Sequence, residues 1–178
     1  MQFGAGMFNP AEENFWRIVK LERSYAEVEG SRLDLQHTEA WLYLSRLRLG
    51  RSDKAAEPKS TNSLLYLLSG QISAEDFAAA LTDAYFAQLD QLAASLPAPA
   101  VVKTQDGQSV TIGTRIERPA RDAVERPYSC LANFMLAEQA LGFGKVAHAK
   151  ALFGIAVDIG ADSEVAHYIS RTELMRLG

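Results

Sequence analysis

The chain has 178 residues, of which 48% are hydrophobic and 22% are charged. This balance is typical of a globular protein and excludes a chain that is disordered throughout. The formal net charge of −4 disfavours non-specific binding to nucleic acid, because it repels phosphate at long range. The single cysteine cannot form an intrachain disulfide, and neither a secretory signal nor a membrane-spanning apolar run is visible. We therefore expect one cytoplasmic domain that has no contact with a membrane.

Two helices are predicted near the start of the chain. Asn9, Pro10 and Glu12 have the spacing of a capping box, which predicts a helix that begins at residue 10. Its apolar residues recur with helical periodicity, and Gly30 is placed to end it. The same periodicity predicts a second helix over 33–49. We expect the two helices to pack as an antiparallel pair.

The next stretch alternates between polar and helical segments. Residues 51–60 are polar and aperiodic, which indicates an exposed loop. A leucine-rich run over 64–68 predicts a short helix. Ser73 is a capping residue for a longer helix that keeps its 3.6-residue period up to Leu96, and Pro97 then ends it.

Residues 101–116 differ from the rest of the chain because they are rich in β-branched side chains. Asp106 and Gly107 form a typical two-residue turn, so this segment is predicted to be a β-hairpin. The expected pairs are Val101 with Ile112 and Lys103 with Val110. Two strands are only marginally stable alone, so we expect their apolar face to lie on the helices or against another sheet edge.

A charged connector over 117–127, bracketed by prolines, is predicted to follow the hairpin. Helices are then expected over 128–141, 145–159 and 163–177. The fold class is therefore all-α, a compact domain of six or seven helices with one inserted hairpin. Its parts are the N-terminal helices (10–96), the hairpin and connector (101–127), and the C-terminal helical trio (128–178).

The helical pair over 130–163 carries small and aromatic residues at regular packing positions. These residues are Leu136, Ala137, Ala140, Gly144, Val146, Ala149, Phe153 and Ala156. Small residues allow two helices to approach closely, and an aromatic ring fills the remaining gap. In this pattern the pair resembles one tetratricopeptide repeat, although Asn133 and Ala161 stand where that family has an aromatic residue and a proline. A solenoid normally needs about three repeats, so a helical hairpin of independent origin stays open.

The tetratricopeptide resemblance implies a concave surface that binds a peptide or another protein. The family positions that line this surface correspond to Leu131, Phe134, Glu138 and Leu141. They form a second apolar stripe on a helix whose other side is already apolar. This stripe is either buried within the domain or open as a binding groove.

A di-metal carboxylate site is an alternative reading of the same helices. Ferritin-like bundles use Glu-x-x-His on two helices and a single Glu on each of two others. Carboxylates and histidines with a comparable order are Glu22, Asp34, His37, Glu138, Glu164 and His167. The simpler interpretation is that Glu22 and Glu138 pair with arginines or lie at helix edges, because buried carboxylates need a partner.

A third reading concerns a basic cluster formed by Arg46, Arg48, Arg51, Lys54 and Lys59. It could bind an anion or nucleic acid, or it could be a solvated helix end, where the helix dipole favours cations. No nucleophile elbow, phosphate loop or zinc motif occurs, and Cys130 has the surroundings of a buried structural thiol. We therefore predict a noncatalytic adaptor, chaperone-like or regulatory protein without a cofactor, whose partner is a protein or peptide. Self-association stays open.

Overall fold

The computed structural model describes residues 6–25, 32–52, 54, 56–58, 62–97, 100–103, 105–106, 108–113, 116–161 and 164–178; the side chains of 20–25, 32–36, 100, 102 and 110–112 are outside this description. Its helices are α1 (Phe8–Tyr25), α2 (Arg32–Arg48), α3 (Ser63–Leu68), α4 (Ala74–Ser95), α5 (Arg121–Gly142), α6 (Val146–Asp158) and α7 (Val165–Leu177). The all-α class with six or seven helices is thus confirmed. No helix in this part of the chain is long and apolar enough to cross a membrane.

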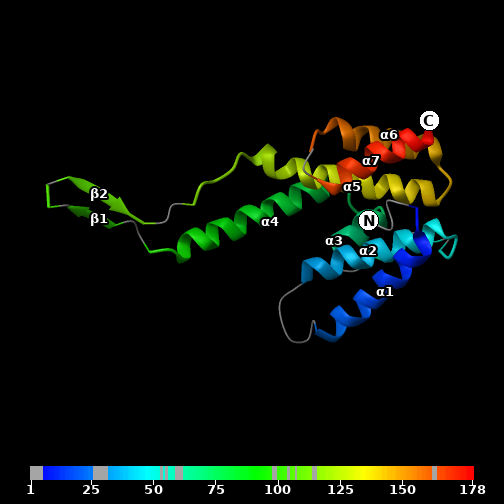
Figure 1. The fold of residues 1–178 in the computed structure, drawn as a ribbon, viewed down its shortest axis with the longest axis horizontal. Coiled ribbons are helices and arrows are strands. Elements are labelled where there is room, and N and C mark those ends of the chain that lie inside the picture. The colour runs from blue at the N-terminus through cyan, green and yellow to red at the C-terminus, as the bar shows by residue number, and fades with distance from the viewer. Residues whose placement is uncertain are drawn as a thin grey trace.

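Helix α5 is the central element of the molecule. It contacts α2, α3, α4, α6 and α7, whereas α1 packs on α2 as its antiparallel neighbour (Figure 1). All seven helices contribute, directly or through adjoining residues, to one apolar core. Within it, the Phe134 ring of α5 lies 5.5 Å from the Trp41 ring of α2 and 6.2 Å from the Phe153 ring of α6. These aromatic contacts join the N-terminal and C-terminal helices.

Small residues set the distance between α5 and its neighbours. Ala137 and Ala140 of α5 are buried, as are Ala149 and Ala156 of α6. On the side facing α2, Gly142 lies so close to Leu47 that an added Cβ atom would be 2.4 Å from the leucine Cγ. Such small residues allow close backbone approach.

We expect Gly142→Ala to lower the free energy of unfolding by about 1–3 kcal/mol, because the new methyl group overpacks the Leu47 contact. The measurement is a urea titration followed by circular dichroism. The matched control is Gly154→Ala in α6, where an added Cβ meets nothing within 4 Å. That change should stabilise the protein by up to about 1 kcal/mol, because alanine is the better helix former. Equal effects of the two changes would contradict the close α2–α5 contact.

One polar side chain ties three helices together beside this core. The Gln139 Nε2 of α5 donates to the Tyr43 hydroxyl of α2 at 3.1 Å and to the Leu68 carbonyl at the end of α3 at 2.6 Å. The Tyr43 hydroxyl in turn donates to the Lys54 carbonyl at 3.1 Å. This network satisfies groups that burial would otherwise leave without partners.

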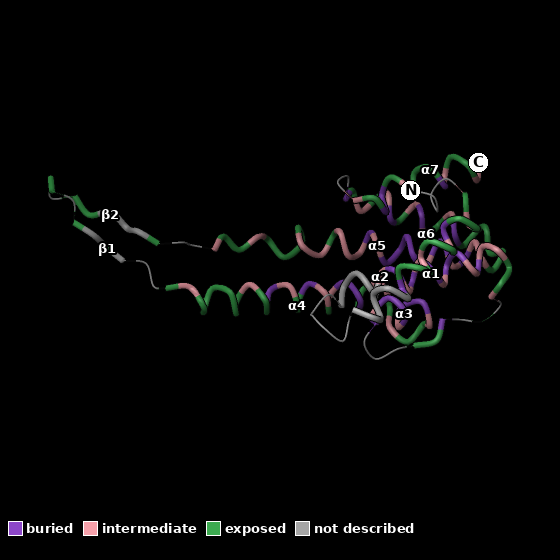
Figure 2. Tube along the Cα trace, turned by 60° about the horizontal axis from the view of Figure 1, so that its bottom comes forward, coloured by how far each residue is buried: buried purple, intermediate pink, exposed green. Residues whose placement is uncertain are grey.

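The later part of α4 and the first part of α5 run side by side and extend beyond the remaining helices (Figures 1 and 2). We call this pair of segments the arm. No residue of α4 after Phe86 is buried, whereas Phe77, Ala78 and Thr82 in its first half are. Exposed ion pairs bridge the arm, from Arg121 to Asp83 and from Arg118 to Asp90, both at 2.8 Å. Each contributes little stability alone.

Two short strands, β1 (Ala100–Lys103) and β2 (Ser109–Ile112), lie at the far end of the arm (Figure 1). They pair antiparallel with Ala100 opposite Ile112 and Val101 opposite Thr111, so the predicted register was wrong by one residue. The expectation that this segment packs on helices was also wrong, because the strands contact none of the described helices. An Asp-Gly dipeptide in a sequence indicates that the chain reverses direction there, but it does not determine which residues of the two strands pair.

Two predicted helix starts need correction. Helix α1 begins at Phe8, and the Met7 carbonyl accepts the Ala11 N–H at 3.1 Å, so Asn9 is not the capping residue. Helix α5 begins at Arg121, so the second half of the predicted connector is helical. Pro127 is tolerated inside α5 at the cost of one hydrogen bond. The i,i+4 pair between Arg126 and Asp122, at 3.3 Å, supports this first part of the helix.

Candidate functional site

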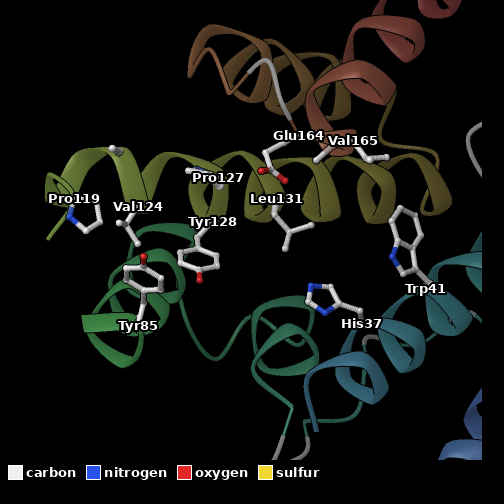
Figure 3. Close-up of a pocket in the computed structure, with 12 residues that line it drawn as sticks. His37, Trp41, Tyr85, Pro119, Val124, Pro127, Tyr128, Leu131, Glu164 and Val165 are labelled. Atoms are coloured by element: carbon white, nitrogen blue, oxygen red, sulfur yellow. The ribbon is translucent and has the colours of Figure 1, made fainter. Parts of the chain in front are cut away.

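A cavity of about 680 Å³ lies where the arm meets the other helices. Its walls come from α2, α4, α5 and the start of α7, and they are mainly apolar or aromatic (Figure 3). The lining residues are His37, Trp41, Tyr85, Pro119, Ala123, Val124, Pro127, Tyr128, Leu131, Glu164, Val165 and Ala166. This volume is within the range of ordinary ligand sites. We refer to it as the arm cavity.

The polar groups of the arm cavity are few and come from all four of its walls. The Tyr85 and Tyr128 side chains are neighbours, and Glu164 reaches from the start of α7 toward α5 (Figure 3). Burial raises the pKa of Tyr128, and the nearby Tyr85 and Glu164 raise it further. Tyr128 therefore stays neutral at physiological pH. His37 of α2 completes the polar set.

Proline and helix-end positions shape the arm cavity. Pro119 precedes α5, and Pro127 lies within it, so that both rings line the wall beside the tyrosines. Glu164 is the residue immediately before α7, with extended backbone and no capping hydrogen bond from its side chain. Val165, the first residue of α7, keeps 69% of its surface exposed. An apolar side chain is thus left open to solvent beside the carboxylate.

The predicted partner-binding residues do not share one open face. Leu131 is half-buried and lines the arm cavity, and Leu141 is half-buried against the core. Phe134 is fully buried, and Glu138 is 1% exposed, so these two residues follow the buried alternative and do not line an open groove. The physical reason is that α2, α6 and α7 cover this side of α5.

Glu138 occupies a buried polar site inside the helical core. The Arg48 Nε lies 3.7 Å from its Oε2, which confirms the simpler expectation that this carboxylate pairs with an arginine. That separation is too long for a hydrogen bond, and the Oε2 atom has no hydrogen-bond partner among the described residues. Burial therefore raises the pKa of Glu138 to about 7, since the attraction of Arg48 offsets only part of the desolvation, while Glu173 raises the pKa further.

The residues of the di-metal alternative fall in several places. His37 and Glu164 line the arm cavity, Glu138 lies beside Arg48, and His167 is buried in α7. The side chains of Glu22 and Asp34 lie outside the described residues. Among the side chains that the structure does describe, no group of three or more potential ligands could hold a metal ion.

The basic cluster is largely engaged within the molecule. Glu12 accepts the Arg46 Nε at 3.0 Å and also pairs with Arg51, whose guanidinium donates to Asn9 at 2.9 Å. Arg48 lies 4.8 Å from the Phe8 ring in addition to its contact with Glu138. Three arginines therefore fasten α1 and α5 to the end of α2. Lys59 lies outside the described residues.

Cys130 has the surroundings that the sequence predicted. The thiol is buried, its sulfur donates weakly to the Ala156 carbonyl at 3.5 Å, and burial raises its pKa to about 11. A thiol with this pKa is almost fully protonated at neutral pH and is a poor nucleophile. Cys130 therefore serves the packing of α5 on α6.

Leu131 was predicted for a partner surface, and His37 and Glu164 for a metal site; the sequence did not indicate that they line one cavity with aromatic walls. Trp41, Tyr85 and Tyr128 come from three helices whose association no local pattern displays. The sequence offered only a weak signal for this cavity, namely that Pro127 directly precedes Tyr128 and both line it.

Comparisons with family models, curated proteins and solved structures found no significant match to this chain.

Proposed function

We propose that this protein is a noncatalytic adaptor that binds an apolar segment of a partner protein in the arm cavity. The observation that carries the proposal is an aromatic and aliphatic cavity of about 680 Å³ that remains open beside the core. Aromatic residues with a polar tip are common at binding surfaces, because they give both apolar contact and a hydrogen bond. Tyr85 and Tyr128 are of this kind.

Two further features support a peptide-like occupant. Val165 lines the arm cavity and is largely exposed, so it extends the apolar surface to the rim, where a bound segment gains contacts in addition to those inside. The α5–α6 pair buries small residues at the positions where a tetratricopeptide repeat does, and we propose that the likeness extends to peptide binding. Leu131 is the member of the predicted concave set that lines the arm cavity.

The test is selection from a phage-displayed library of random short peptides, followed by fluorescence-anisotropy titration of the selected peptides. We expect Val165→Asn to weaken their binding by about three- to tenfold, because apolar contact at the rim is lost. Val146→Asn is the matched control, since Val146 is likewise an exposed first residue of a helix but lies in α6, away from the arm cavity. Peptides that bind both variants equally well would contradict the proposal.

A further inference from the structure

Glu164 contributes the carboxylate among the described residues that line the arm cavity. It is half-buried, and its side chain neither caps α7 nor forms an ion pair within the described part of the chain. The helix dipole favours a carboxylate at this position. The dipole does not, however, require the side chain to extend toward α5 and line a cavity, as it does here (Figure 3).

The arginines nearest to the arm cavity along the chain are already engaged elsewhere. Arg118 pairs with Asp90, Arg121 with Asp83 and Glu125, and Arg126 with Asp122. None of these cations is directed to Glu164. The Glu164 carboxylate is therefore left to pair with a positive group brought by a ligand.

The tyrosines add a second attraction for the same kind of group. Figure 3 shows the Tyr85 and Tyr128 side chains as neighbours, and Glu164 is near enough to Tyr128 to raise its pKa. Aromatic faces attract cations, and a guanidinium can stack on a ring while it donates to a carboxylate. Val124 and Leu131 of α5 lie on either side of Tyr128 and give the arm cavity an apolar wall (Figure 3).

We propose that the occupant of the arm cavity is a segment of a partner protein in which a basic residue lies beside an aromatic or leucine side chain. The basic residue pairs with Glu164 and stacks on the tyrosines, and its apolar neighbour fills the Val124 and Leu131 wall. This inference rests on the proposed function. It adds that the bound segment carries a positive charge.

The experiment uses the full chain and the peptide library described above. Peptides selected on the wild type should be enriched in arginine or lysine next to an apolar residue. Glu164→Gln should weaken their binding about tenfold, and the remaining binding should depend less on salt. Selection on Glu164→Lys should instead enrich aspartate or glutamate. A lysine is tolerated immediately before a helix in this fold, because Lys145 holds that place before α6. Circular dichroism checks that each variant is folded.

The matched control is Glu75→Gln, because Glu75 is an exposed carboxylate in the first turn of α4 and does not line the arm cavity. It should leave binding unchanged. Selected peptides that need Val165 but carry no basic residue, or that are insensitive to Glu164→Gln, would overturn this inference and leave the proposed function standing. A lack of any Val165-dependent peptide would overturn both.

Discussion

Phe134→Ala is expected to lower the free energy of unfolding by about 3–5 kcal/mol. The Phe134 ring is completely buried and contacts the rings of Trp41 and Phe153, so its removal leaves a cavity at the junction of α2, α5 and α6. Urea denaturation followed by tryptophan fluorescence measures the effect, because Trp41 is itself in the affected contact.

The control for this change is Phe143→Ala at the end of α5, where the ring is 37% exposed. Phe143→Ala should lower the free energy of unfolding by at least about 2 kcal/mol less than Phe134→Ala does, because truncating a partly solvated ring removes less buried apolar surface. If both variants lose the same free energy, Phe134 does not lie in the core, and the covered face of α5 has been assigned incorrectly.

Glu138→Gln is expected to change how stability depends on pH. The pKa of Glu138 is about 7 in the folded protein, and its ordinary value is 4.5. Because the folded state binds the proton more tightly, this group's stabilising contribution is complete below pH 4.5. It is lost as the pH rises through 7, and the total loss is about 3 kcal/mol. Glutamine cannot ionise, so the variant should not show this loss.

The measurement is the difference in unfolding free energy between Glu138→Gln and wild type, followed from pH 4.5 to pH 8. The difference should shift toward greater stability of the variant as the pH rises. Glu75→Gln, an exposed carboxylate change, should show no comparable shift. If the difference in unfolding free energy between Glu138→Gln and wild type does not change with pH, Arg48 fully compensates for the burial of the Glu138 charge.

Local signals predicted much of the helical structure. Ser73 caps α4 as expected, with its Oγ accepting the Asp76 N–H at 3.0 Å. Gly70 ends the short α3 segment with a positive φ of 75°, which glycine adopts without steric cost. The predictions failed where two local signals competed. At Pro127 the proline signal suggested a break, but charged i,i+4 neighbours and the packing on α4 extend the helix through it.

The candidate site was less predictable because its geometry depends on contacts between distant segments. Helical periodicity shows that α5 is apolar on two sides, but it does not show which side the other helices cover. Phe134 and Glu138 face the covered side, whereas Leu131 meets the arm cavity. Likewise, the partner of Glu138 is Arg48 on another helix, and no spacing within α5 identifies it.

The amide of Gln139 has a consequence for how uniquely the chain folds. Contacts between leucine and alanine side chains tolerate small sliding movements, because apolar attraction has little directionality. Hydrogen bonds are directional, and this one amide must reach both the Tyr43 hydroxyl and the Leu68 carbonyl. Alternative packings that slide α5 by one turn would break both hydrogen bonds of this half-buried amide, at a cost of about 1 kcal/mol each. The amide therefore favours the observed position of α5 against α2 and α3 over such shifted packings.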